Sequence, residues 1–306
     1  MPEVLRIGTR RSALALWQAE HVAQRLREAW PGLVVELVPF VTQGDRILDR
    51  PLPEIGGKGV FTVELEAALR AGELDLAVHS LKDLPTDDPE GITVGAIPGR
   101  ADPGDAWVCP AGIAPMDLPD GAVVGTSSTR RAAQLLRLHP GLDIRSIRGN
   151  VGTRIDKVHA GPYVATVLAC AGLDRLGRRD AATSVFEPEA MLPAPGQGAL
   201  GIQRRSDDPE TTRLLDALDD AEARACVEAE RHFLAALGGG CSAPVGALAV
   251  VEDSQLFLRG RVLALDGSEA VDVQATEDVG PEAARRVGEA AARAALTQGA
   301  AALLSP

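Results

Sequence analysis

Lysine is nearly absent from this chain of 306 residues. Its only lysines are Lys58, Lys82 and Lys157, so arginine supplies 28 of the 31 basic residues. The formal net charge is −12. General binding to nucleic acid depends on a basic surface that neutralises phosphates, so this balance argues against a nucleic-acid partner.

Long hydrophobic runs are also missing. No stretch approaches the length needed to cross a bilayer, and the first residues lack a basic region followed by an apolar run. We therefore expect a cytoplasmic protein without a membrane partner, and nothing demands more than a monomer. Cysteine is scarce and never occurs at CxxC spacing, which argues against a metal site and against a disulfide framework. The four cysteines are Cys109, Cys170, Cys226 and Cys241.

The patterns that are present predict an α/β fold with several domains. With 306 residues and 45% hydrophobic content, the chain is long enough for two or three domains with cores of their own. A strand at 4–8, a helix from the N-cap Ser12 to about Trp30 and a strand at 33–40 form a βαβ unit, which favours a mostly parallel sheet.

Three domains are expected. The first α/β domain takes 1–98 and 199–217, and the second takes 103–193, with 193–198 as a hinge between them. The third takes 221–306. There a helix at 222–237 and a closing helix at 282–298 accompany strands at 245–251, 255–265 and 270–275, and Asp266-Gly267 is a strong hairpin signal. This last part is a small α+β domain with an antiparallel sheet.

An irregular stretch of 18 residues, 42–59, separates the second strand from the next helix. It is rich in glycine and proline and contains Lys58. Loops of this length inside a compact domain are typically lids or binding loops, so we interpret it as a lid. Plain disorder is the alternative.

The segment 74–85 carries an apolar strand into a cluster of ionisable groups. Leu74, Leu76 and Val78 alternate with less apolar residues, and the cluster ends at Pro85. Ligands of open α/β sheets bind beyond the carboxyl ends of strands. Lys82 and Asp83 are therefore candidates for the site, although an ordinary exposed ion pair in a turn is the simpler reading of the dipeptide alone.

Positive charge is concentrated in residues 126–154, which contain six arginines and one acid. The sequence Thr126-Ser-Ser-Thr-Arg-Arg131 follows a predicted strand and opens a helix. Backbone N–H groups, hydroxyls and guanidinium groups at a helix N-terminus suit a carboxylate or phosphate. An N-cap with solvated arginines is the alternative, and Arg131 fits it best.

Motifs rich in glycine, hydroxyl and charged residues occur along nearly the whole chain. They are Gly8-Thr-Arg-Arg-Ser-Ala-Leu-Ala15 with Gln18, Gly44-Asp45, Gly56-Gly-Lys-Gly59 with Phe61, Ala77-Val-His-Ser-Leu-Lys-Asp-Leu-Pro85, Val124-Gly-Thr-Ser-Ser-Thr-Arg-Arg131, Arg148-Gly-Asn-Val-Gly-Thr-Arg154, Leu192-Pro-Ala-Pro-Gly-Gln-Gly198 and Gly239-Gly-Cys241. In sequence, order and intervals these motifs resemble the porphobilinogen deaminase family, also called hydroxymethylbilane synthase. Two residues depart from the family pattern: Ala13, where Pro or Lys is expected, and Asp174, where many relatives have a basic residue.

The resemblance implies a transferase of tetrapyrrole (haem and porphyrin) biosynthesis. Such an enzyme joins four porphobilinogen molecules head to tail into hydroxymethylbilane and releases ammonia at each step. It also implies two domains like those of periplasmic binding proteins, and a covalently held dipyrromethane that serves as primer. Pyrroles with acetate and propionate groups are anionic, and arginine forks bind carboxylates with fixed geometry, which explains a basic site in an acidic protein.

By motif position, the resemblance assigns a role to each site residue. Asp83 is the catalytic carboxylate, which stabilises the cationic azafulvene left when ammonia departs. Cys241 holds the primer through a thioether, and Lys58 and Phe61 belong to the lid. The primer's other contacts are Lys82, Asp83, Thr126, Ser127, Ser128, Arg130, Arg131, Arg148 and Gly149. Substrate contacts are Arg10, Ser12, Arg148, Arg154, Arg175 and Gln197. His79 and the other three cysteines are interpreted as structural.

Two other functions stay open on the residues alone. A non-catalytic anion-binding protein with two lobes explains the hinge and the arginines, but it does not explain the Gly-Gly-Cys loop or the Lys82-Asp83 pair. A thiol-dependent hydrolase using Cys241 needs a neighbouring base, and the sequence identifies none.

Overall fold

The computed structural model describes residues 4–42, 44, 61–240 and 243–304. The predicted lid at 42–59, including Lys58, lies almost entirely outside the described residues, and so does Cys241. Contacts divide the chain into two compact units, residues 1–101 with 199–224 and residues 102–198 with 225–306. Each unit is described by itself.

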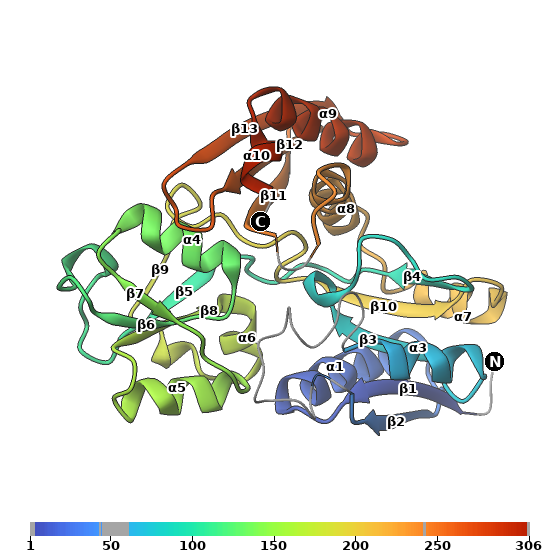
Figure 1. Cartoon of the computed structure of the whole chain (residues 1–306). Coiled ribbons are helices and arrows are strands. Elements are labelled where there is room, and N and C mark those ends of the chain that lie inside the picture. Colours follow the sequence, from blue (N-terminus) through green and yellow to red (C-terminus); the bar gives the residue numbers. More distant parts are fainter. Residues whose placement is uncertain (1–3, 43, 45–60, 241–242, 305–306) are drawn as a thin grey trace. The chain divides into compact units, whose positions relative to one another are not determined.

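The first unit is built on a five-stranded mixed sheet in the order β2-β1-β3-β10-β4 (Figure 1). β1, β2 and β3 are parallel, whereas β10 runs antiparallel to both β3 and β4. The sequence therefore has to return to this sheet after leaving it for the second unit. The elements are β1 (Leu5–Arg10), α1 (Ala13–Ala29), β2 (Val35–Phe40), α3 (Val63–Arg70), β3 (Leu76–Ser80), the 3-10 turn η2 (Leu81–Asp83), β4 (Ile92–Ala96), β10 (Leu200–Arg205) and α7 (Pro209–Leu215).

Helices cover both faces of this sheet. The Oγ of Ser12 accepts a hydrogen bond from the backbone N–H of Ala15 and begins α1, as predicted. α1 packs its buried stripe, which includes Val22 and Leu26, against β1 and β3 together with leucines of α7. α3 covers the opposite face with Leu65 and Leu69. The carboxyl ends of β1 and β3 are thus held between two packed layers.

The second unit contains a sheet with a similar plan, in the order β7-β6-β8-β5-β9. β6, β7 and β8 are parallel, and β5 is antiparallel to its neighbours. Its elements are β5 (Asp105–Val108), the turn η3 (Pro115–Asp117), β6 (Val123–Gly125), α4 (Thr129–Leu138), β7 (Asp143–Arg145), α5 (Val151–His159), β8 (Ala165–Ala169), α6 (Cys170–Arg175), the turn η4 (Arg179–Ala181) and β9 (Ser184–Val185).

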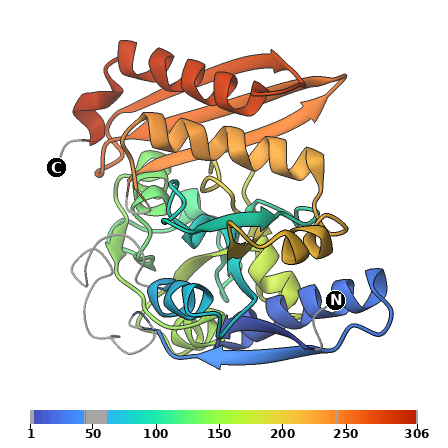
Figure 2. The ribbon, with the colours of Figure 1, turned by 90° about the vertical axis from the view of Figure 1, so that its right-hand side faces the viewer.

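The last part of the chain forms a three-stranded antiparallel sheet in the order β11-β12-β13. Figure 2 shows α8 and α9, in orange and red, running along these strands. Phe233 of α8 is fully buried in their common core. The elements are α8 (Ala221–Ala236), β11 (Val245–Glu252), β12 (Gln255–Leu263), β13 (Ala270–Asp278), α9 (Ala283–Thr297) and α10 (Ala300–Leu304).

Within the second unit, this sheet packs closely on α4 and on the segment before Gly198. The tip of the β12–β13 hairpin touches α4, because a Cβ on Gly267 would lie 2.5 Å from the carbonyl oxygen of Ala133. Glu230 of α8 is fully buried and accepts hydrogen bonds from the backbone N–H groups of Gly196 (2.7 Å) and Ala249 (2.8 Å). The α+β part is therefore tied to the α/β part through backbone contacts.

The predicted fold class is confirmed: two mixed α/β sheets and a small antiparallel sheet with helices are present. The division into three domains stays a prediction, because contacts group the second and third parts into one unit. β5 and β10 were not predicted. None of the described helices is long and apolar enough to cross a membrane.

Candidate active site

The carboxyl ends of β1 and β3 place the predicted site residue Arg10 near polar residues of the matched motifs. Arg10 ends β1 and Ser80 ends β3, and these strands are parallel neighbours. Gln18 of α1 is buried and donates a hydrogen bond from Nε2 to Ser80 Oγ at 2.9 Å. Polar side chains from two strands and one helix thus meet where α/β sheets bind ligands.

Asp83 lies in the short turn that follows β3. The buried leucines Leu81 and Leu84 anchor this turn, and the Leu81 N–H donates to the carbonyl oxygen of Ala199 at 3.0 Å. Between these anchors, Lys82 is half-buried and Asp83 is exposed. The packing of the leucines therefore fixes the backbone and leaves the Asp83 carboxylate accessible.

Arg10, at the end of β1, contacts Phe61, a residue predicted to belong to the lid. The Arg10 guanidinium carbon lies 4.1 Å from the centroid of the Phe61 ring, which is a cation–π geometry. Gly44 packs on the same ring, since a Cβ at that position would lie 2.1 Å from a ring carbon. Both predicted site residues are therefore next to each other in the first unit.

His79 is buried on β3. Burial, followed by the charge of Arg10, lowers its pKa from 6.5 to about 4, and Gln203 opposes the shift. Gln203 is close enough to influence the ring, but the geometry is not that of a hydrogen bond, since neither His79 Nε2 nor Gln203 Oε1 has a partner among the described residues. Burial agrees with the structural role expected for His79.

In the second unit, the hydroxyl groups of the predicted anion site lie in the segment between β6 and α4. Ser128 Oγ accepts from the Arg131 N–H and caps the helix. Thr126 Oγ1 accepts from the Ser128 N–H at 3.1 Å. Ser127 Oγ is 2.8 Å from Ser146 Oγ and donates to the Ile147 carbonyl oxygen at 2.8 Å. The segment is thus preorganised by its own side chains.

The alternative of solvated arginines at this helix start is wrong. Arg130 and Arg131 are 4% and 6% exposed, because both pair with Asp105, which is fully buried at the start of β5. Burial lowers the pKa of Arg130, and the Asp105 charge opposes this effect. Asp105 was not among the residues predicted for the site.

Arg148 and Arg154 frame the loop before α5. Gly149 between them has φ +121, a conformation that L side chains rarely adopt. Arg154 Nε donates to the Gly149 carbonyl oxygen at 2.8 Å, and Lys157 Nζ donates to that of Arg148 at 2.9 Å. The loop is therefore held by basic side chains that follow it.

Arg175 and Gln197 meet the segment that leads back to the first unit. Arg175 Nη2 donates to the Gly198 carbonyl oxygen at 2.7 Å, and burial lowers its pKa to about 10 while Asp174 opposes the shift. Asp174, the departure from the family pattern, also pairs with the exposed Arg179 at 3.1 Å. Gln197 is 1% exposed and donates to Asp105 Oδ1 at 2.9 Å.

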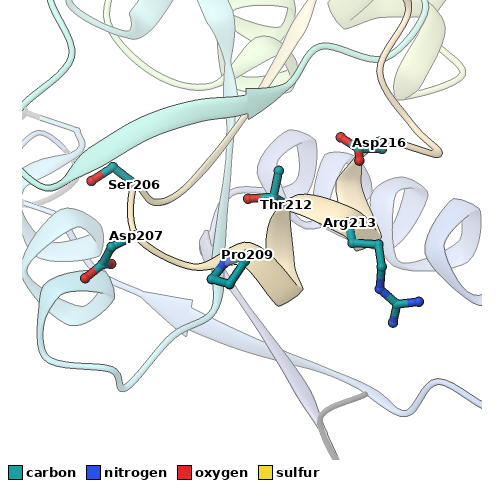
Figure 3. Close-up of a pocket in the computed structure, with 6 residues that line it drawn as sticks. All are labelled: Ser206, Asp207, Pro209, Thr212, Arg213 and Asp216. Carbon is teal, nitrogen blue, oxygen red and sulfur yellow. The ribbon is translucent and has the colours of Figure 1, made fainter.

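A surface pocket of about 400 Å³ lies elsewhere, on the loop after β10 and on α7 (Figure 3). β10 is antiparallel to β3, with Leu200 opposite Ser80. The far end of β10 therefore lies at the amino end of β3, away from Asp83. Among the described residues, no three His, Cys, Asp or Glu side chains are grouped as metal ligands.

Comparison with known proteins identifies relatives over the full length. The family model "Porphobilinogen deaminase, dipyromethane cofactor binding domain" matches residues 5–213, and "Porphobilinogen deaminase, C-terminal domain" matches 224–297. The porphobilinogen deaminase of Roseiflexus sp. (strain RS-1) is 50% identical over 308 residues, which cover 100% of both chains. That of Roseiflexus castenholzii (strain DSM 13941 / HLO8) is 52% identical over 267 residues, covering 87% of this chain and 88% of the relative.

Among solved structures, the methionine binding protein MetQ is similar with a TM-score of 0.46 and 14% sequence identity. The match covers 73% of this chain and 93% of that chain.

Proposed function

The chain belongs to the porphobilinogen deaminase family, and we propose that it joins four porphobilinogen molecules into hydroxymethylbilane with Asp83 as the catalytic carboxylate. The observation that carries this proposal is the position of Asp83. It is an exposed carboxylate on a turn anchored by buried leucines, directly after the end of β3. Release of ammonia from porphobilinogen leaves a cationic azafulvene, and a fixed carboxylate stabilises such a cation.

Asp83 also accounts for proton transfer. A carboxylate beside a pyrrole nitrogen accepts its proton when charge develops on the ring and returns it afterwards. Arg10 and Lys82 are cations at the same strand ends: Arg10 binds the acetate and propionate groups of the substrate, and Lys82 binds those of the primer. Ser12 and Gln18 supply polar contacts at the start of α1, and Phe61 supports Arg10.

The residues of the second unit fit an anionic dipyrromethane. Two buried guanidinium groups share one carboxylate, so one positive charge is left over, and Arg130 Nε has no hydrogen-bond partner among the described residues. A buried cation of this kind is stabilised by an anionic ligand. Groups that would hold it are Thr126, Ser127, Ser128, Arg130, Arg131, Arg148 and Gly149, with Arg154, Arg175 and Gln197 for added substrate.

When bound, the dipyrromethane supplies the pyrrole carbon to which new units are joined. Cys241 is proposed as its point of attachment on the strength of the Gly239-Gly240-Cys241 motif alone. A reactive cysteine needs access, and glycine neighbours provide it. Cys109, Cys170 and Cys226 are buried, as expected for structural cysteines.

The same proposal includes the setting of the enzyme. We place it in the cytoplasm as a monomer that binds neither nucleic acid nor membrane. The net charge of −12 supports the exclusion of nucleic acid, and the thiols of Cys109 and Cys170, which form no disulfide, are typical of a reducing compartment. Light scattering of the purified protein checks the monomer, and a dimer mass would contradict it.

Mass spectrometry and product analysis test the proposed function. The purified chain should exceed its sequence mass by two pyrrole units, confined to the peptide with Cys241, and should convert porphobilinogen into hydroxymethylbilane and ammonia. Cys241→Ala should fold without the added mass, because the change removes the proposed attachment sulfur and one small substitution seldom prevents folding. Unmodified but active protein, or primer attached elsewhere, would contradict the assignment.

A further inference from the structure

Asp105 is the most buried charged group of the second unit's anion site. It opens β5, and the whole strand, Asp105–Val108, is buried. No solvent reaches the carboxylate, so its interactions come from protein groups. A buried carboxylate is stable only when it is paired and hydrogen-bonded.

The carboxylate joins three segments that are distant in the sequence. Arg130 Nη1 donates to Oδ2 at 2.8 Å. Arg131 donates to Oδ1 through Nε at 3.0 Å and Nη2 at 2.6 Å, and Gln197 Nε2 donates to the same oxygen at 2.9 Å. The start of β5, the first turn of α4 and the segment before Gly198 are thereby fixed to one group.

Backbone carbonyl oxygens complete the geometry of the two guanidinium groups. Arg130 Nη1 also donates to Leu192 at 2.7 Å, and Arg131 Nη1 donates to Val167 at 2.9 Å. An arginine side chain has many rotamers, and ordering it costs conformational entropy. Here that entropy is lost during folding, before any ligand arrives, so the forks are preorganised.

The charges of these groups explain why the carboxylate is needed. Two neighbouring guanidinium groups repel each other in a buried site, and one carboxylate between them leaves a single net positive charge. If the carboxylate were absent, at least one side chain would be driven towards water. Asp105 therefore decides both where the two forks lie and how much positive charge remains.

We propose that Asp105 is the positioning residue of the anion site: it fixes Arg130 and Arg131 so that their remaining positive charge is presented to a carboxylate of the dipyrromethane. This inference rests on the proposed function. Asp105 itself does not touch the ligand, because it is enclosed by the groups that it orients.

Primer loading provides a measurement independent of turnover. The full chain is produced without its primer in a host that cannot make porphobilinogen, then incubated with porphobilinogen, and the mass increase is followed with time. Loading rates are expressed per folded molecule at a temperature well below the melting temperature Tm. A parent chain that gains no mass would contradict the proposed function itself, whereas the inference on Asp105 concerns only differences between variants.

For Asp105→Asn we expect folded protein that loads primer roughly tenfold to a hundredfold more slowly, because small misplacements of binding groups have effects of this size. The half-saturating porphobilinogen concentration should rise as well. Asp102→Asn is the matched control. Asp102 lies in the same segment and pairs with Arg179, but it is half-exposed, so its variant should load at the parental rate.

A purely structural role for Asp105 makes a different prediction. It would lower Tm while leaving the loading rate per folded molecule and the half-saturating concentration at their parental values. Observing that result for Asp105→Asn would overturn the proposal.

Asp105→Glu provides the second test. It restores the carboxylate but moves it by one methylene, so we expect loading faster than in Asp105→Asn and slower than in the parent. If Asp105→Asn does not fold, Asp105→Glu decides alone. Half-saturation raised several-fold would support positioning, and parental half-saturation would overturn it.

Discussion

Asp83 lies on an exposed turn after β3, whereas Arg130 and Arg131 are buried around Asp105 at the start of α4. Both sets of residues are proposed to contact the same kind of ligand. The turn that carries Asp83 is anchored by the buried leucines beside it, so its exposed carboxylate can be changed without disturbing their packing. The arginines belong to the folded core of their unit, so a change there affects structure and binding together.

This difference agrees with the chemistry proposed for each group. A carboxylate that exchanges protons with successive substrates has to be reached by each of them. A fork that binds a permanent group benefits from burial, since charge-assisted hydrogen bonds are stronger away from water. Exposure is therefore expected of the carboxylate that exchanges protons, and burial is expected of the arginines that bind a permanent group. Substitutions can test whether changes at exposed charges affect turnover and changes at buried charges affect stability.

The largest effect is expected for Asp83→Asn. The amide keeps the shape and loses the charge, and loss of one preorganised electrostatic group typically lowers turnover about a hundredfold or more. Folding and primer content should be unchanged, because Asp83 is exposed. Hydroxymethylbilane formation is the measurement, after primer content has been checked by mass.

Asp88→Asn is the control, because the Asp88 carboxylate is also exposed between β3 and β4 and accepts a hydrogen bond from Thr93. Its turnover should stay at the parental value. Turnover of primer-loaded Asp83→Asn within about threefold of the parent, less than 1 kcal/mol, would make Asp83 structural.

Glu230→Ala, unlike Asp83→Asn, should lower the stability of the fold. Removing the buried carboxylate leaves the N–H groups of Gly196 and Ala249 without their acceptor and opens a cavity, so we expect a loss of about 3 kcal/mol in the free energy of unfolding. Urea unfolding measures it. Glu222→Ala, on an exposed position of the same helix, should change stability by less than about 0.5 kcal/mol. If both variants changed the free energy of unfolding equally, the buried Glu230 carboxylate would not stabilise the fold.

Local patterns predicted much of the fold. The Ser12 cap and the stripe of α1 identified the first helix, and Asp266-Gly267 identified the last hairpin. β10 was missed because its place depends on pairing with β3, more than a hundred residues earlier in the chain. β5 was missed because all four of its residues are buried, so it shows no alternation of polar and apolar positions.

Some candidate site residues were predictable from the sequence and others were not. Asp83, Arg10 and the arginines of α4 lie in continuous motifs, and the structure places Arg10 at a strand end, Asp83 on the turn after a strand and the arginines at a helix start. Asp105 pairs with residues 25 and 26 positions later, and nothing in its own neighbourhood indicates an ion pair. Lys58 and Cys241 lie outside the described residues, so their roles stay predictions.

Because His79 is buried, the free energy of unfolding should depend on pH. Its pKa is about 4 in the folded protein and 6.5 ordinarily, so between these values the unfolded chain binds more protons than the folded one. Stability is therefore full above pH 6.5 and is lost as pH falls, by about 2 kcal/mol between pH 6.5 and 5.

Urea unfolding at several pH values measures this loss. The parent and His79→Gln should differ in slope across this window, while His159→Gln, on an exposed position, should keep the parental slope. Identical slopes in all three proteins would show that His79 is not buried in its neutral form.

The smallest effect is expected at Asp75, which precedes the same strand that Asp83 follows. Asp75 accepts three hydrogen bonds from Arg6, through the backbone N–H at 2.8 Å, Nε at 3.2 Å and Nη2 at 3.1 Å. Arg6 is 38% exposed, so water weakens the pair, and Asp75→Asn should lower the free energy of unfolding by only about 1 kcal/mol. Turnover should not change, since Asp75 lies at the amino end of β3. The two aspartates thus flank one strand, and urea unfolding and hydroxymethylbilane formation are measured for both variants. If Asp75→Asn lowered turnover as strongly as Asp83→Asn, position at the carboxyl end of β3 would not explain the role of Asp83, and the contrast between the two ends of this strand would fail.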